Sequence, residues 1–379
     1  MKPRMVLMFI IFISVYLLLN FYIGWHGAFL LRYSGAGVPQ GVYWIVFFLI
    51  AFSYLIGRAR LLPGPAGRLF KVIGSYYFAV LEFSVLLLPL ADLAAWLLHL
   101  GGVEASVYIP AIGYTVTAVM IVLLLWGSWN AWSPVVRTYP IDIRKKPGAA
   151  RTLKIAVASD IHLGNLVGRR HLHRLVRRIN AMEPDLILFP GDVIDDVIEP
   201  FIRNRMGEVM QQLKSRLGIY AVLGNHEYYG GHIEEYIRQM DTIGVRVLRD
   251  ETVTLPGTLA IAGRKDKTSE AAGGGGRMST EALLADLDKT LPIVLMDHQP
   301  YGFQQAAEAG ADILLSGHTH RGQFAPNHFI TRRLFELDWG YMRKGNLHVA
   351  VSSGFGTWGP PIRLASRSEI IQLVVTFTD

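Results

Sequence analysis

Four long apolar segments in the first third of the chain restrict its fold more than any other feature. They lie at about 5–23, 41–57, 72–100 and 107–126. A helix that crosses a bilayer needs roughly 20 mostly apolar residues, with a range of about 17–25. No small-residue cleavage site follows the first segment, which favours a retained span over a cleaved signal peptide. Residues 1–136 are therefore predicted to form an all-α membrane domain with four transmembrane helices.

Positive charge is distributed unevenly around these segments. Residues 1–136 contain seven Lys and Arg against three Asp and Glu, and most of the basic residues precede the first segment or follow the second. A further basic cluster follows the fourth segment. Because loops rich in Lys and Arg tend to stay in the cytoplasm, we expect a multi-pass protein of the inner (cytoplasmic) membrane whose carboxy-terminal domain faces the cytoplasm.

The composition excludes several chemistries. The chain has no cysteine, which rules out thiol catalysis, disulfides and cysteine-ligated metals. The net charge is +7, but residues 137–379 carry only +3 of it, since 30 of the 37 Lys and Arg and 27 of the 30 Asp and Glu lie there. A nucleic-acid groove usually concentrates basic residues in the soluble part. The expected partner is therefore the bilayer and not a nucleic acid; the oligomeric state is left open.

A linker and a second domain are expected after the apolar segments. Residues 137–152 contain prolines and three consecutive basic residues at 144–146, and are predicted to be a linker along the membrane surface. From residue 153 onward, short apolar runs alternate with helical patterns, which is typical of an α/β domain. Residues 153–379 are numerous enough to enclose a core of their own.

Five short apolar runs in this second domain each lead into a polar cluster. Ligands of open α/β sheets gather beyond the carboxyl ends of the strands, so we expect these clusters to form one site at a sheet edge. The runs are 153–158, 186–189, 219–223, 293–296 and 313–315, and they lead into Asp160-Ile161-His162, Gly191-Asp192, Gly224-Asn225-His226-Glu227, Asp297-His298 and Gly317-His318-Thr319-His320, respectively.

The stretches between these runs have mostly helical patterns. His171 and His173 lie in the first helical stretch and are expected to be solvated. Four consecutive glycines at 273–276 predict that residues 267–277 form a mobile loop, either a passive surface insertion or a lid. The predicted helices are 169–180, 201–214, 232–243 and 280–288.

The polar clusters supply the ligands of a metal site. Mixed carboxylate, imidazole and amide ligands suit first-row metals such as Mn, Fe or Zn. Seven candidates exceed the needs of one tetrahedral site and suit two ions about 3.5–4 Å apart that share a carboxylate. We therefore expect two divalent ions, with Mn favoured and Fe, Zn or Mg as alternatives. The candidate ligands are Asp160, His162, Asp192, Asn225, His298, His318 and His320.

The order of these motifs resembles the calcineurin-like metallophosphoesterase family, and the closing segment 354–363 resembles its membrane-associated bacterial phosphodiesterase branch. The resemblance covers about residues 153–377 and implies an α-β-β-α sandwich. It also implies how the ligands are divided. One metal would be held by Asp160, His162, Asp192 and His320, and the other by Asp192, Asn225, His298 and His318, with Asp192 bridging the two.

Further roles follow from the same resemblance. His226 would hydrogen-bond the phosphate and protonate the leaving oxygen, and Asp195 would orient His226. Separately, the charge of a phosphate needs cations besides the metals, so Arg264 and Lys265, which follow a predicted strand at 258–262, and Arg363 in the closing segment are candidate substrate-binding residues. The alternative for each of these cations is a surface salt bridge or a membrane-facing charge.

The expected function is that of a membrane-anchored dinuclear-metal phosphoesterase. It would use metal-activated water to hydrolyse a phosphodiester or pyrophosphate bond in a lipid-linked substrate, for example a UDP-linked acylated glucosamine or a phospholipid. Two alternatives remain open. One is a tethered phosphodiesterase for soluble substrates, and the other is a membrane sensor or transporter with a regulatory metal domain.

Overall fold

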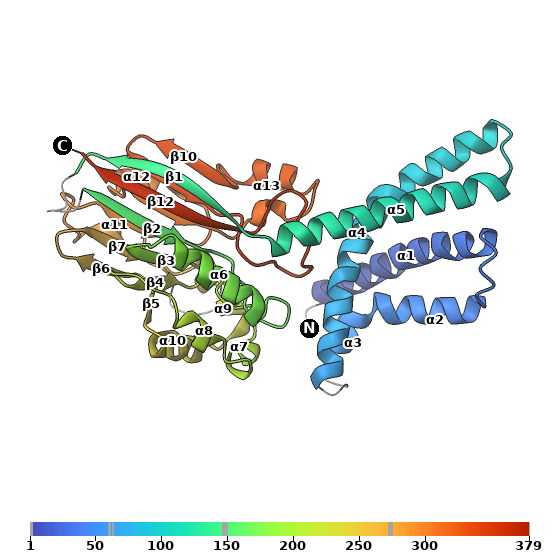
Figure 1. Ribbon diagram of the computed structural model, residues 1–379, viewed down its shortest axis with the longest axis horizontal. Helices are drawn as coiled ribbons and strands as arrows, with labels where there is room; N and C mark the ends of the chain where they lie inside the picture. Colours follow the sequence, from blue (N-terminus) through green and yellow to red (C-terminus); the bar gives the residue numbers. More distant parts are fainter. Residues whose placement is uncertain (1–2, 60–61, 63, 146–150, 272–275, 379) are drawn as a thin grey trace. The chain divides into compact units, whose positions relative to one another are not determined.

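The chain forms two compact units, divided between Gly127 and Ser128. The computed structural model describes residues 3–59, 62, 64–145, 151–271 and 276–378. Among these residues, the first unit is helical and all the strands lie in the second unit (Figure 1).

The first unit is built from apolar helices. Three of them, α1, α4 and α5, are long and apolar enough to cross a membrane. The prediction of one continuous spanning helix at 41–57 is wrong, because this segment forms two short helices that are separated at Phe52. At about 1.5 Å per residue, α2 reaches only ~18 Å, well short of a ~30 Å hydrocarbon core. The helices are α1 (Pro3–Tyr33), α2 (Gln40–Ala51), α3 (Ser53–Arg58), α4 (Gly64–Leu100) and α5 (Ala105–Trp132).

Two six-stranded sheets lie at the centre of the second unit. The first has the order β1-β12-β2-β3-β4-β5, and the second has the order β10-β11-β9-β8-β7-β6. The five predicted strands are confirmed as β2, β3, β4, β8 and β9. The bounds are β1 (Val135–Ile143), β2 (Thr152–Val157), β3 (Leu186–Pro190), β4 (Ile219–Val222), β5 (Val245–Leu248), β6 (Glu251–Leu255), β7 (Leu259–Gly263), β8 (Ile293–Met296), β9 (Ile313–Ser316), β10 (Gly340–Lys344), β11 (Leu347–Val351) and β12 (Glu369–Phe377).

Helices cover the outer faces of both sheets, which confirms the predicted α-β-β-α sandwich (Figure 1). Successive side chains of a strand point to opposite faces. Ile187 of β3 therefore packs under the helices, whereas Leu186 and Leu188 enter the core between the sheets. The first sheet carries α6 (Arg169–Ala181), α7 (Glu199–Arg203), α8 (Met206–Met210), α9 (Asn225–Gly230) and α10 (Ile233–Thr242); the second carries α11 (Thr280–Leu284) and α12 (Phe303–Glu308).

The predicted linker at 137–152 is only partly a linker. Residues 135–143 form β1, which pairs in parallel with β12 at the edge of the first sheet. Proline is tolerated on edge strands because one side of the strand needs no hydrogen-bond donors, and Pro140 lies in such a position. Ile141 and Ile143 of this strand are buried between the sheets. Residues 146–150 lie outside the described part of the chain.

Some helical predictions also differ from the structure. The stretch 201–214 forms the short helices α7 and α8, because Arg205 between them adopts a left-handed backbone with φ of 48°. His171 was predicted to be solvated but is buried, and its ring stacks on Phe355 at 4.2 Å. It lies one helical turn before the buried Leu175 and so shares its face. His173 is exposed, as predicted.

The glycine-rich stretch is described only in part. Within the predicted loop at 267–277, residues Lys267–Glu270 form the short 3-10 helix η1. Residues 272–275 lie outside the described part of the chain, so the choice between a lid and a passive insertion stays open.

Candidate metal centre

The predicted ligands lie in the segments that directly follow β2, β3, β4, β8 and β9, where the carboxyl ends of parallel strands meet. Two glycines allow these segments to approach each other. A Cβ atom on Gly317 would lie 2.1 Å from Asp160 Oδ2, and one on Gly224 would lie 2.2 Å from Asp192 Oδ1. Any side chain at either position would displace a predicted ligand.

The backbone at the ligands is itself unusual. Five of the seven candidates have a positive φ, in a region that residues other than glycine seldom adopt. Such strained positions cluster at functional sites, where the surrounding structure holds them in place. The five are Asp160 (50°), His162 (50°), Asp192 (53°), His318 (72°) and His320 (49°).

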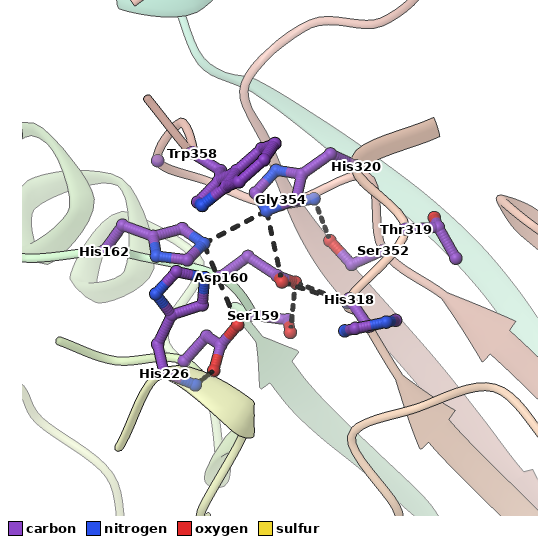
Figure 2. A network of polar contacts seen from close by, with 12 residues as sticks. Ser159, Asp160, His162, His226, His318, Thr319, His320, Ser352, Gly354 and Trp358 are labelled. Carbon is purple, nitrogen blue, oxygen red and sulfur yellow. Dashed lines mark hydrogen bonds and ion pairs between the residues drawn. The ribbon is translucent and has the colours of Figure 1, made fainter. Parts of the chain in front are cut away.

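A first group of ligand atoms is formed by Asp160, His162 and His320 (Figure 2). The Nε2 atoms of the two histidines are 3.0 Å apart, and Asp160 Oδ1 lies 3.5 Å from His320 Nε2. Ligands at neighbouring corners of an octahedral ion with bonds of ~2.1 Å are about 3 Å apart. The separation between the two imidazole nitrogens therefore fits a shared metal ion.

A second group contains Asn225, His298 and His318. Asn225 Oδ1 lies 3.1 Å from His298 Nε2 and 2.8 Å from His318 Nδ1. Asp192 Oδ2 lies 3.1 Å from His298 Nε2 and 3.9 Å from His162 Nε2. Asp192 is thus placed between the two groups, as a bridging carboxylate must be.

Hydrogen bonds fix these ligands in orientations suited to a metal. His298 Nδ1 lies 2.9 Å from the carbonyl oxygen of Pro190, which can only accept, so Nδ1 donates to it and Nε2 is the nitrogen that faces Asn225 and Asp192. Ser159 Oγ donates to Asp160 Oδ2 over 2.6 Å. The backbone N–H of His226 donates to Asp192 Oδ1 over 2.9 Å, which leaves Oδ2 facing the site.

Burial keeps several of the imidazoles neutral. It lowers the pKa of His162 to about 3 and the pKa of His318 to about 4. Burial also lowers the pKa of His320 well below its ordinary value, with a contribution from the neighbouring His162. Because neutral imidazole is the form that binds metals, the three side chains are ready to act as ligands at neutral pH.

Comparison with known proteins agrees with this geometry. The family described as calcineurin-like phosphoesterase matches residues 153–322. An uncharacterized metallophosphoesterase of Aquifex aeolicus is 33% identical over 244 residues, which cover 63% of this chain and 91% of that protein. The chain belongs to the calcineurin-like phosphoesterase family. This family implies divalent metal ions.

Two vertebrate relatives are named as transmembrane proteins. A transmembrane protein with metallophosphoesterase domain from Bos taurus is 34% identical over 279 residues, covering 70% of this chain and 62% of the relative. The protein of the same name from Danio rerio is 32% identical over 285 residues, covering 72% of this chain and 65% of the relative. The chain thus spans a little under two thirds of each. Together with the three apolar helices, these relatives support a membrane-associated metallophosphoesterase.

His226 lies against the first ligand group, but its ring is oriented by a different residue from the one predicted. Its ring meets the ring of His162 edge-on, with centroids 4.6 Å apart. Its Nδ1 is 2.7 Å from Asp196 Oδ1, whereas the predicted partner Asp195 is 3.6 Å away. Burial would lower the pKa of His226, but the hydrogen bond to Asp196 and the nearby carboxylates outweigh burial and raise the pKa to about 9.

The structure places the three predicted phosphate-binding cations in internal contacts. Arg264 Nη1 donates to Asp297 Oδ2 over 3.0 Å, and Lys265 Nζ lies 3.7 Å from Asp250 Oδ2. Arg264 and Lys265 are thus each close to a carboxylate of the fold. The salt-bridge alternative describes this arrangement, although a role of either residue in binding remains a prediction.

Arg363 is completely buried, and its predicted contact with substrate stays a prediction. Its guanidinium donates to the carbonyl oxygens of Ser353 over 2.7 Å and Gly356 over 2.5 Å. Its Nη2 lies 3.2 Å from His320 Nδ1, on the side of the ring away from the ligand group. The sequence showed the charge of Arg363 but not that the Gly- and Pro-rich segment folds around it. Arg363 therefore contacts the candidate ligand His320 at the ring nitrogen that does not face the ligand group.

Glu227 is a further site residue to which the sequence analysis gave no role. Its carboxylate is buried and accepts backbone N–H groups of Gly224 (2.7 Å), Ile194 (3.0 Å) and Asp192 (3.1 Å). It therefore ties the loop after β3 to the loop after β4. The signal was present, because Glu227 directly follows His226 in the Gly-Asn-His-Glu motif.

Proposed function

We propose that this chain hydrolyses a phosphodiester or pyrophosphate bond in a lipid-linked substrate, such as a UDP-linked acylated glucosamine or a phospholipid, on the cytoplasmic leaflet of the inner membrane. The single observation that carries the hydrolytic part is the pair of ligand groups that meet at Asp192. The membrane unit supports the choice of a lipid-linked substrate, because it keeps the same chain at the bilayer.

The proposed division of ligands follows the two groups. One ion would be held by Asp160, His162, Asp192 and His320, and the other by Asp192, Asn225, His298 and His318. We favour Mn, with Fe, Zn or Mg as alternatives, because the donors are carboxylate, imidazole and amide groups. When bound, two such ions activate a water and stabilise the charge on the phosphoryl oxygens.

The remaining steps rest on side chains of the chain. Asp196 holds Nδ1 of His226, so the Nε2–H of this imidazolium is the group available to the leaving oxygen. Proton donation from Nε2 avoids the release of an unprotonated alkoxide. Glu227 keeps His226 and Asp192 in register, because its carboxylate binds backbone N–H groups of both loops.

The proposal is tested with the purified full chain in nanodiscs. Given Mn, the protein should hydrolyse bis-p-nitrophenyl phosphate, and His226→Ala should lower kcat by roughly 10²–10⁴-fold for a diester with a poor alkyl leaving group, which needs a proton donor. The loss should be smaller for the p-nitrophenyl ester, whose leaving group is stable without a proton. His173→Ala, an exposed histidine of α6, is the matched control.

The outcomes separate the alternatives. No turnover with any divalent metal would exclude the enzymatic proposal and favour a regulatory metal domain in a sensor or transporter. Equal kcat/KM for a lipid-linked pyrophosphate and for its water-soluble, deacylated counterpart would favour a tethered phosphodiesterase for soluble substrates. A preference for the lipid-linked form supports the proposal.

A further inference from the structure

A short helix of the second unit, α13 (His328–Leu334), exposes an apolar surface. Its side chains Phe329, Ile330 and Leu334 are 62%, 59% and 67% exposed. Single exposed apolar residues are common, but three on one seven-residue helix form a cluster, and exposed clusters mark interaction sites. Folding of the second unit does not account for this surface, because none of the three side chains enters a core.

The same helix carries two adjacent cations. Arg332 and Arg333 are exposed, and neither forms an ion pair with any residue that the structure describes. Thr331, between the apolar residues and the arginines, is held by a hydrogen bond from its Oγ1 to Asp338 Oδ2 over 2.6 Å. The surface formed by Phe329, Ile330, Arg332, Arg333 and Leu334 is called the α13 surface below.

The α13 surface is connected at both ends to the candidate metal centre. The 3-10 helix η2 (His320–Gly322), which precedes α13, contains the candidate ligand His320. Phe335, which directly follows α13, places its ring 6.3 Å from the ring of His318 and 5.2 Å from that of Tyr301. Both histidines of the Gly-His-Thr-His motif therefore lie next to the ends of this helix.

We propose that the α13 surface inserts into the headgroup region of a bilayer that contains anionic lipids. Apolar side chains flanked by Arg are the composition of segments that lie in the membrane interface, where the apolar groups enter the acyl boundary and the cations meet anionic headgroups. A bilayer is the partner that a membrane-associated chain always has within reach. Insertion would set the metal centre at the depth of lipid phosphates.

The absence of cysteine makes this insertion directly measurable. In full-length Ile330→Cys carrying a nitroxide label, collisions with oxygen and with a water-soluble nickel chelate report the depth of the label in the bilayer. In vesicles with phosphatidylglycerol, we expect oxygen to exceed nickel accessibility at position 330. Ile202→Cys is the matched control, because Ile202 is also an exposed isoleucine on a short helix of this unit, and its label should remain accessible to nickel.

A second arm tests the cations. Adding Arg332→Ala and Arg333→Ala to the labelled protein should raise nickel accessibility at position 330, and high salt should do the same because it screens the attraction to anionic lipids. Leu334→Cys provides an independent label position if Ile330→Cys does not fold, as judged by circular dichroism. The readout needs no hydrolysis, so this proposal and the proposed function fail separately.

Three results would overturn the proposal. The first is a label at position 330 as accessible to nickel as that at 202 in vesicles with and without anionic lipid. The second is protection that persists in detergent and is accompanied by dipolar broadening between labels, which would assign the surface to a second copy of the chain. The third is protection that appears only after a lipid substrate is added, which would assign the surface to the acyl chain of that substrate.

Discussion

At the scale of single residues, the proton held by His226 depends on its neighbours. The side chain is buried, and burial alone would favour the neutral ring. The contact of 2.7 Å with Asp196 opposes burial and, with the other carboxylates, raises the pKa of His226 to about 9. A raised pKa means that His226 stays protonated at neutral pH and loses its proton as the pH rises through that value.

This gives a prediction for the pH dependence of the reaction. Asp196→Asn keeps an acceptor for Nδ1 but removes the charge, so the alkaline limb of kcat for an alkyl phosphodiester should move to lower pH by roughly 1–3 units. Asp195→Asn, at 3.6 Å, should move it less. An unchanged alkaline limb in Asp196→Asn would show that the limb does not report His226.

The site residues divide into those that the sequence allowed us to predict and those that it did not. The seven candidate ligands were predictable because each lies in a polar cluster directly after an apolar run. The end of such a run marks the carboxyl end of a buried strand, which is where the ligands of an α/β sheet gather. Whether Asp195 or Asp196 meets His226 depends on the backbone angles of one loop, which spacing does not determine. The burial of Arg363 depends on how a Gly- and Pro-rich segment folds, and its charge alone suggested a surface residue.

At the scale of secondary structure, β1 is the strand that the sequence analysis did not predict. Its apolar positions alternate, but Pro140 and the basic residues after it suggested a linker. The strands β3, β8 and β9 were predictable because each is a short run that is buried on both faces, and β2 and β4 because apolar residues predominate in them. No glycine or proline lies at Phe52, where α2 and α3 are separated. The sequence therefore did not indicate the break, and the length of the helix predicted at 41–57 was overestimated.

The role of β1 in the fold can be tested by a cavity. Ile141 is 1% exposed and lies in the core between the sheets. Ile141→Ala should destabilise the second unit by about 2–5 kcal/mol, through lost burial and the cavity left behind. Val136→Ala on the same strand, where the side chain is 36% exposed, should cost far less. Thermal unfolding of the two variants, followed by intrinsic fluorescence, compares them; equal melting temperatures would place β1 outside the folded core.

At the scale of the whole molecule, the number of membrane crossings decides the side on which the ends of the chain lie. Crossings by α1, α4 and α5 alone would put the amino terminus and the second unit on opposite sides. The basic residues before the first apolar segment, after the second and after the fourth instead favour one common side. If α2 and α3 together crossed the membrane as one interrupted span, the chain would have four crossings, and both of its ends would lie on the side that the basic residues favour.

Cysteine accessibility tests this topology in intact cells. Arg144→Cys, at the exposed residue directly after β1, should not react with a membrane-impermeant thiol reagent if the second unit is cytoplasmic. Ala36→Cys, in the turn between α1 and α2, should react and serves as the positive control. The chain contains no other cysteine, so the background is absent. Labelling at position 144 from outside would place the second unit on the opposite face of the membrane.

The positive φ angles at Asp160, His162, Asp192, His318 and His320 have a consequence for how this chain can change. Each left-handed residue other than glycine costs about 1–3 kcal/mol when the structure holds it in place. Glycine at any of the five would relieve that cost and remove a ligand. Selection for stability and selection for catalysis therefore pull in opposite directions at these five positions, and a variant chosen only for heat resistance is expected to lose its metal centre first.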